Sequence, residues 1–380
     1  MSSRRQFLVS SATLALASLL PLRLAAASTH KRLLVVVLRG AMDSLGALVP
    51  YVDPRYRSLR GSLALAEDER SLLRLDSTFA LHGALAPLLP LWQNGELLLL
   101  PASASNYRER SHFDGQNVLE SGASQPHLLA SGWLNRSLNE LPGASALAIG
   151  PSLPLLLQGP ASVGAWSPSK LPPVADDFLR RVQQMYASDA QLAPTLAAAV
   201  GMNGASGMDG QQGQQAVLEL FQQCAVFLRS SARIASLDLN GWDTHSNQGS
   251  EQGRLANQLQ LLARGLSQFR QTMDADWQHT AVLVVTEFGR TVRVNGSGGT
   301  DHGTASMAML LGGKVRGGRW LGDWPSLARL YEDRDLYPAN DLRSLLKGTL
   351  HEHLGISHEA LEQRVFPASS TALAYSGLFA

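Results

Sequence analysis

The sequence alternates short, continuous apolar runs with longer stretches of helical character. The apolar runs occupy residues 33–38, 96–100, 234–239, 281–286 and 306–311. Strands that are buried on both faces of a parallel sheet read in this way, because neither face meets water. The predicted helices occupy residues 85–92, 113–120, 176–187, 214–230, 251–273 and 341–353. The alternation predicts an α/β fold with a mostly parallel central sheet and helices on both faces.

The chain is long enough for one large domain or two ordinary ones. Residues 152–173 are rich in Pro, Ser and Gly, and residues 201–213 combine Gly, Met, Asn and Gln, so both stretches suit loops. Neither stretch divides the chain, because the strand-like runs on either side can belong to one sheet. We therefore predict a single domain over residues 28–380, with an irregular insertion near residues 150–213.

Composition excludes several classes of protein. The net charge is +1, and 45% of the residues are hydrophobic and 17% are charged, which is ordinary for a globular protein. No basic block indicates nucleic-acid binding, and no apolar run after the N-terminal segment is long enough for a membrane span. Cys224 is the single cysteine, so an intramolecular disulfide cannot form, and its apolar neighbours indicate a buried thiol.

Residues 1–27 have the order of a twin-arginine signal peptide. Arg4 and Arg5 directly precede an apolar stretch at residues 8–20, and residues 25–27 are three alanines. The apolar stretch is shorter than the roughly 20 residues that span a membrane, so it indicates targeting and not anchoring. We predict cleavage before Ser28 and export by the twin-arginine translocase, which gives a periplasmic or secreted protein.

Acidic and histidine side chains follow the predicted strands. In open α/β sheets, ligands bind outside the carboxyl ends of the strands. The residues near these ends are Asp43, Asp243, His245, Glu287, Asp301 and His302. Carboxylate oxygen and imidazole nitrogen suit a divalent ion such as Zn, Mn or Ca, and a metal relieves the repulsion between neighbouring carboxylates. The alternative is that these residues serve as turn and helix-cap residues.

Ser111 lies where a predicted helix begins, after the strand at residues 96–100. Free backbone N–H groups and the helix dipole favour an anion or a nascent alkoxide at such a position. Ser111 could therefore be a nucleophile, or it could be a simple helix cap, and the two roles are compatible. The next residue, His112, could face the site or stack in the core.

Six segments carry a resemblance to a known family. They are residues 38–43 (LRGAMD), 49–51 (VPY), 110–114 (RSHFD), 241–245 (GWDTH), 286–291 (TEFGRT) and 299–303 (GTDHG). On these segments, the chain resembles the domain of unknown function 1501 family, which comprises twin-arginine-exported bacterial proteins related to alkaline phosphatases and sulfatases. The segments extend over most of the mature chain.

The resemblance implies an alkaline-phosphatase-like three-layer sandwich with a metal site at the carboxyl edge of its sheet. Its residue assignments make Asp43 the ligand after the first strand, Asp243 and His245 the middle pair, and Glu287, Asp301 and His302 the remaining ligands. They put Ser111 in the place of the nucleophile. The middle pair departs from the alkaline phosphatases, whose spacing is wider than Asp-x-His, and Glu287-Phe288 stands where they have Asp-His.

Two functional hypotheses follow. The first is a metal-dependent hydrolase of a phosphate or sulfate ester, small or polymeric, in which Ser111 attacks and Arg290 or Arg39 holds a non-bridging oxygen. The second is a non-catalytic periplasmic binding or assembly factor that retains the hydrolase fold. The altered ligand spacing favours the second hypothesis, and substitution of Ser111 distinguishes the two.

A twin-arginine signal has a consequence for metal loading. Because such a substrate crosses the membrane already folded, its metal can be selected in the cytoplasm, away from competing periplasmic ions. Replacing residues 1–27 with a signal for an unfolded-chain pathway is expected to yield apo or mismetallated protein, measured by elemental analysis. A normal metal content by that route would mean that the signal peptide directs export only and has no role in metal loading.

Overall fold

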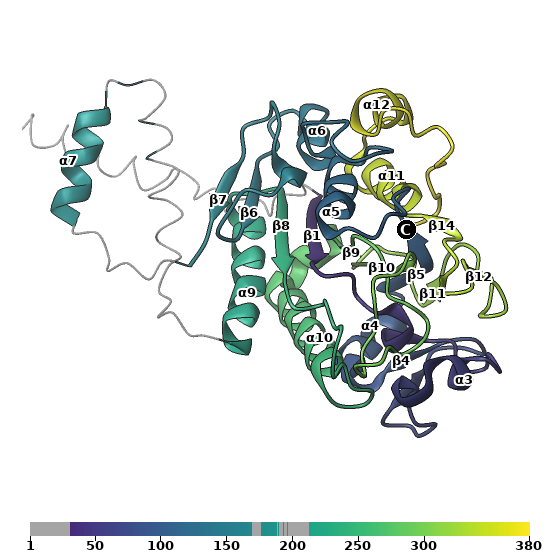
Figure 1. Cartoon of the computed structure of the whole chain (residues 1–380). Helices are drawn as coiled ribbons and strands as arrows, with labels where there is room; N and C mark the ends of the chain where they lie inside the picture. Colours follow the sequence, from purple (N-terminus) through teal and green to yellow (C-terminus); the bar gives the residue numbers. More distant parts are fainter. Residues whose placement is uncertain (1–30, 169–175, 188, 190–192, 194–195, 197–212) are drawn as a thin grey trace, which may run out of the picture. The chain divides into compact units, whose positions relative to one another are not determined.

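The computed structural model describes residues 31–168, 176–187, 189, 193, 196 and 213–380. The predicted signal peptide and nearly all of the predicted loop at residues 201–213 lie outside these ranges. Within them, the central sheet has nine strands (Figure 1). In sheet order these are β11 (Arg319–Trp320), β5 (Leu97–Ala104), β10 (Ser306–Gly312), β9 (Thr280–Thr286), β1 (Arg32–Leu38), β8 (Ile234–Leu239), β6 (Ala146–Ile149) and β7 (Gly164–Trp166), with β14 (Asn340–Asp341) beside β5.

The sheet is mostly parallel. Strand β1 lies between β8 and β9 and is parallel to both, so that Leu38 pairs with Leu239 on one side and with Thr286 on the other. The pairs β6–β8, β6–β7, β11–β5 and β14–β5 are also parallel. Strand β10 alone among these runs antiparallel to its neighbours β9 and β5. The predicted fold class is confirmed.

Alternate side chains of β1 enter two different cores. Leu34 and Val36 join a cluster with the helices α9 (Gln214–Ser230) and α10 (Arg254–Met273). Leu33 and Val35 join a second cluster, with helices on the opposite face of the sheet. Those helices are α5 (His112–Ser121), α6 (Trp133–Asn139) and α11 (Leu342–Leu354). The strand is therefore buried on both faces, as its continuous apolar run predicts, and the sandwich has three layers (Figure 1).

Shorter elements complete the described chain. Two small sheets form, one from β2 (Leu48–Val49), β4 (Ala80–His82) and β3 (Leu72–Arg74), the other from β12 (Leu330–Tyr331) and β13 (Asp335–Leu336). The remaining described helices are α2 (Ser44–Ala47), α3 (Tyr56–Arg60), η1 (Gly61–Leu63), η2 (Gly83–Leu88), α4 (Leu89–Gln93), η3 (Leu155–Leu157), α7 (Asp176–Tyr186), η4 (Asp274–His279), α12 (His358–Ala360) and η5 (Leu361–Val365).

Several boundaries differ from the sequence-based expectation. The helix expected at residues 85–92 is a 3-10 segment followed by a short α-helix, because Pro87 and Pro90 interrupt the donor ladder. The strand expected at residues 96–100 extends to Ala104. Part of the expected irregular insertion is regular, since β7 pairs with β6 at the sheet edge.

In the part of the chain that the structure describes, no helix has the length and apolar character needed to cross a membrane.

Cys224 is fully buried and unpaired, and burial raises the pKa of its thiol. A thiol that stays protonated is a poor nucleophile, so Cys224 serves as a core side chain.

His353 links the helical layer to the sheet. Its side chain is 3% exposed, and its Nε2 donates to the carbonyl oxygen of Arg32 at 2.8 Å. Burial is the largest cause that lowers the pKa of His353, from 6.5 to about 4. The neutral imidazole is therefore the form that the native state contains.

Acid is expected to destabilise the fold through His353. Well above pH 6.5, His353 is neutral in both the native and the unfolded state. As the pH falls below 6.5, the unfolded chain binds a proton at His353, whereas the native state stays unprotonated there until the pH approaches 4. The free energy of unfolding should fall by roughly 3 kcal/mol over this range from this group. Urea unfolding between pH 7 and 4.5 measures the free energy of unfolding as a function of pH. This free energy should depend less on pH in His353→Gln than in wild type, whereas His358→Gln, at an exposed position, should keep the wild-type dependence. Equal slopes for the two variants and wild type would contradict the assignment.

Candidate metal centre

The carboxyl ends of β1, β8 and β9 lie at one edge of the sheet, and the loops that follow them are in contact. Gly40 has a φ of 118°, and a Cβ at this position would lie 2.5 Å from the backbone nitrogen of Asp243. The N–H of Gly40 donates to Glu287 Oε1 at 2.9 Å. A side chain at residue 40 would push these loops apart, so glycine is required here.

Three side chains bring their ligand atoms within 4.8 Å of one another: His112, Asp243 and His302. His245 lies beside them, with its Nε2 2.9 Å from His302 Nε2 and 3.1 Å from Asp243 Oδ1. His112 Nε2 is 3.6 Å from Asp243 Oδ2 and has no hydrogen-bond partner among the residues that the structure describes. We call these four side chains the His–Asp cluster. Its members come from α5, from the loop after β8 and from the loop after β9.

Each imidazole of the cluster has its other nitrogen bound to an oxygen. His112 Nδ1 lies 2.8 Å from Glu287 Oε1, and His302 Nδ1 lies 2.9 Å from the carbonyl oxygen of Arg110. His245 Nδ1 lies 3.2 Å from an oxygen of Asp301. Carboxylate and carbonyl oxygens only accept, so the proton of a neutral imidazole stays on Nδ1. The three Nε2 lone pairs therefore face the centre of the cluster, as in histidines that ligate metals.

The arrangement fits a divalent ion. His245 Nε2 and His302 Nε2 lie 2.9 Å apart, and with both Nδ1 protons retained their lone pairs repel unless a proton or a metal ion lies between them. Asp243 adds a carboxylate oxygen to the same place. A set of three imidazole nitrogens and one carboxylate suits Zn or Mn, whereas Ca prefers oxygen ligands only.

The charges around the cluster keep its members in the forms that bind a metal. Burial favours a neutral Asp243, but the hydrogen bond and charge of Arg290 outweigh burial and hold the pKa of this carboxyl below its usual value. Burial also opposes ionisation of Glu287, and the hydrogen bond from His112 is the largest cause that keeps its pKa low. Burial lowers the pKa of His302, so its imidazole is neutral.

Arg290 holds Asp243 and is closed to solvent. Its Nη1 donates to Asp243 Oδ1 at 2.6 Å, its Nε donates to Thr300 Oγ1 at 3.2 Å, and its Nη2 donates to the Thr300 carbonyl. The side chain is 0% exposed. Arg39 is also engaged, by Glu120 and Asp238. Neither guanidinium is in a position to hold a substrate oxygen without first releasing a carboxylate.

Asp43 lies outside the His–Asp cluster. Asp43 is 1% exposed, and its Oδ2 accepts from Arg60 Nη2 at 2.5 Å and from Gln248 Nε2 at 2.6 Å. The Gln248 side-chain oxygen accepts from the hydroxyls of Thr244 and Thr300. Asp43 is thus the start of a buried network that supports the loops bearing Asp243 and His302. Two other predicted ligands, Glu287 and Asp301, also lie outside the cluster, and they contact His112 and His245, respectively.

Ser111 directly precedes His112 and takes the N-cap position of α5, without a side-chain capping bond. It is half-buried, and its backbone N–H donates to the hydroxyl of Tyr107. The preceding residue, Arg110, has a φ of 63°. This left-handed conformation is costly for a side-chain-bearing residue, and it accompanies the contact between the Arg110 carbonyl and His302.

Comparison with known proteins identifies the family. The sequence profile of a family described as "Protein of unknown function (DUF1501)" matches residues 103–366, which is more than half of the chain. The chain belongs to the DUF1501 family. No curated protein matches the sequence. The matched range contains every member of the His–Asp cluster.

Solved structures with similarity to this DUF1501 protein are distant. The zinc complex of the C-terminal periplasmic domain of EcEptC from Escherichia coli is 12% identical, with a TM-score of 0.41 over 90% of this chain and 88% of that one. A 2-O GAG sulfatase is 8% identical, with a TM-score of 0.44 over 92% and 73%. The lipoteichoic acid synthase LtaP from Listeria monocytogenes is 8% identical, with a TM-score of 0.38 over 90% and 76%. At these scores the likeness says nothing about activity.

Glu287→Gln is expected to weaken metal binding. The substitution keeps an oxygen near His112 but removes the charge that fixes its ring and raises its basicity, and such changes cost roughly 10- to 100-fold in metal affinity. Competition with a chromogenic chelator measures the Zn²⁺ and Mn²⁺ affinities. Glu140→Gln, which removes an ion pair with Arg364 elsewhere on the surface, is the matched control. An unchanged affinity in folded Glu287→Gln would contradict a supporting role for this carboxylate.

Proposed function

We propose that the chain is a metal-dependent hydrolase of a phosphate or sulfate ester. The observation that carries the proposal is the 2.9 Å approach of His245 Nε2 to His302 Nε2, with both Nδ1 atoms committed to oxygens. A divalent ion would be held by His112, Asp243 and His302, with His245 beside them. When bound, such an ion polarises an ester oxygen and stabilises the charge that develops on it.

Ser111 is the nucleophile in this proposal. Its hydroxyl oxygen bonds to the phosphorus or sulfur of the ester as the bond to the leaving oxygen breaks, and the serine proton passes to the leaving alcohol. Water then hydrolyses the seryl ester and restores the hydroxyl. The position of Ser111 at the N-terminus of α5 supports the role, because first-turn N–H groups lack helical partners and favour an anion.

The protein groups around the cluster would act by positioning. Glu287 and the Arg110 carbonyl fix two imidazole rings, and Arg290 fixes the carboxylate of Asp243. Restricting these groups before a substrate arrives lowers the entropic cost of assembling the site. Arg290 therefore has a positioning role in this proposal, and it does not contact the ester.

A second candidate is a non-catalytic binding or assembly factor that keeps a metal at the same place. The observation that favours it is that the guanidinium groups of Arg290 and Arg39 are both bound to carboxylates of the protein. An esterase for anionic substrates commonly presents a free cation, and neither of these two arginines provides one.

The location of the protein is also a proposal. Arg4 and Arg5 before an apolar stretch support export through the twin-arginine translocase, with a mature domain from about Ser28 onwards in the periplasm or outside the cell. Export of a folded chain agrees with a site whose ligands come from distant parts of the sequence, because such a site forms only after folding.

Two substitutions distinguish the candidate functions. His302→Ala removes a ligand and should lower both the metal content and the kcat/KM for p-nitrophenyl phosphate or p-nitrophenyl sulfate by more than roughly 100-fold. Ser111→Ala should keep the metal and lower kcat by a similar factor. The assays use the mature chain loaded with Zn²⁺ or Mn²⁺.

His358→Ala, at an exposed position far along the chain from the cluster, should retain both metal and activity. Purified wild-type protein without a stoichiometric metal would refute the proposed centre. Full metal content with no hydrolysis of either ester, in wild type and Ser111→Ala alike, would favour the binding factor.

A further inference from the structure

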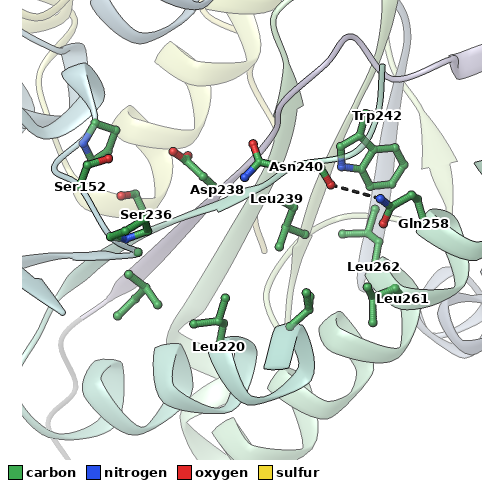
Figure 2. Close-up of a pocket in the computed structure, with 15 residues that line it drawn as sticks. Ser152, Leu220, Ser236, Asp238, Leu239, Asn240, Trp242, Gln258, Leu261 and Leu262 are labelled. Carbon is green, nitrogen blue, oxygen red and sulfur yellow. Dashed lines mark hydrogen bonds between the residues drawn. The ribbon is translucent and has the colours of Figure 1, made fainter. Parts of the chain in front are cut away.

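A cavity of about 440 Å³ begins next to the His–Asp cluster along the chain but is separate from it. Trp242, the residue before Asp243, lines this cavity together with leucines of α9 and α10 (Figure 2). Among the described residues that line it, neither Ser111 nor any member of the cluster is found. The groups that contact Ser111 lie instead on α5 and in the loop before this helix.

Tyr107 contacts Ser111 through its phenol group. The residue is 5% exposed, and its ring belongs to a small buried apolar cluster with Phe288. The phenol oxygen accepts from the Ser111 backbone N–H at 3.1 Å. Phe288 in turn stacks on His112, with ring centroids 5.0 Å apart. The phenol is therefore held beside both the proposed nucleophile and the packing that supports the cluster.

The phenol of Tyr107 has one proton and two lone pairs to place. The proton is donated to Asp114 Oδ2 at 3.4 Å, and one lone pair accepts the Ser111 N–H. The second lone pair can only accept. The Ser111 hydroxyl is the donor beside it, and this hydroxyl makes no capping bond to α5. Burial is the largest cause that raises the pKa of Tyr107, so the phenol stays protonated, and hydrogen bonds of the Ser111 backbone and side chain oppose that rise.

Asp114 is held in place from its other oxygen. Its Oδ1 lies 3.1 Å from His127 Nε2, and the His127 backbone N–H donates to Asn117 Oδ1 at 2.7 Å. His127 has a left-handed backbone with a φ of 58°, a conformation that persists only where contacts enforce it. Because a carboxylate only accepts, Asp114 keeps the phenol proton directed away from Ser111.

We propose that Tyr107 positions the hydroxyl of Ser111. The free lone pair of the phenol accepts the Ser111 O–H, which restricts rotation of the hydroxyl and leaves the lone pairs of the serine oxygen to attack the ester. Restricting the nucleophile before the substrate binds lowers the entropic cost of reaching the reactive geometry. This role depends on the nucleophilic role of Ser111 in the proposed function. Tyr107 is a positioning residue, because it acts through Ser111 and not on the ester.

Tyr107→Phe removes the phenol oxygen and keeps the ring that packs with Phe288. In the mature chain loaded with Zn²⁺, kcat for p-nitrophenyl phosphate should fall by roughly 10-fold, the value of one hydrogen bond. KM and the Zn²⁺ affinity should stay at their wild-type values, because no member of the His–Asp cluster is altered. Steady-state kinetics and chelator competition measure the three quantities.

Two further variants separate positioning from support of the fold. Tyr56→Phe is the matched control, because Tyr56 is 3% exposed and its phenol donates to the carbonyl of Leu45, outside the cluster. It should keep the wild-type kcat. Asp114→Asn puts an amide N–H beside the phenol of Tyr107. This N–H can donate to the phenol oxygen in place of the Ser111 hydroxyl, so kcat should fall several-fold at an unchanged KM.

A wild-type kcat in Tyr107→Phe would overturn the positioning role. A raised KM at an unchanged kcat would also overturn it, because the phenol would then contact the substrate. Equal losses of kcat and Zn²⁺ affinity would mean that Tyr107 supports α5 and nothing more. In each of these cases the proposed hydrolase stands. A fully metal-loaded wild type that hydrolyses no ester would instead refute the hydrolase, and the positioning role with it.

Discussion

The parallel pairing of β1 with both β8 and β9 is the constraint on which the site depends. Strands that run in one direction end at one edge, so the loops after residues 38, 239 and 286 must meet there. Glycine at residue 40 lets these loops approach to contact distance. The covalent chain supplies no such proximity, since nearly 250 residues separate the first loop from the third. The sheet therefore builds the site, and the loops supply its chemistry.

Buried charge decides which acidic residues could serve as ligands. A buried carboxylate needs a partner, and Asp43 has two donors on Oδ2, Arg60 and Gln248, at a place outside the His–Asp cluster. Asp243 is paired as well, with Arg290, but its side chain remains 43% exposed and borders three imidazoles. Gln248 binds Asp43 and accepts from the hydroxyl of Thr300, and Arg290 donates both to that hydroxyl and to Asp243, so the two carboxylates belong to one network. One carboxylate supports the loops, and the other faces the centre of the cluster.

Sequence reasoning predicts the central strands well and the site only in part. The strands β1, β8, β9 and β10 can be recognised in the sequence as continuous apolar runs, because both faces of each strand are buried. The strands β6 and β7 are too short to be recognised in this way. The segments with Asp243 and His302 follow predicted strands, so their convergence is foreseeable. The role of His112 is not, because α5 follows β5, which two strands separate from β1. Only the tertiary packing of α5 brings His112 to Glu287.

The conformation of a single residue, Arg110, contributes to the position of two imidazoles. Its backbone is left-handed, its carbonyl oxygen contacts His302, and it lies two residues before His112, the first residue of α5. Such a conformation persists only if other contacts enforce it, and here the Arg110 guanidinium is bound by the fully buried Asp335 at 2.8 Å. Asp335 also accepts from Thr304, just after His302 in the sequence. One buried carboxylate, Asp335, thus links the start of α5 to the loop after β9. The strained backbone at Arg110 accompanies a fixed orientation of the imidazole rings of His112 and His302.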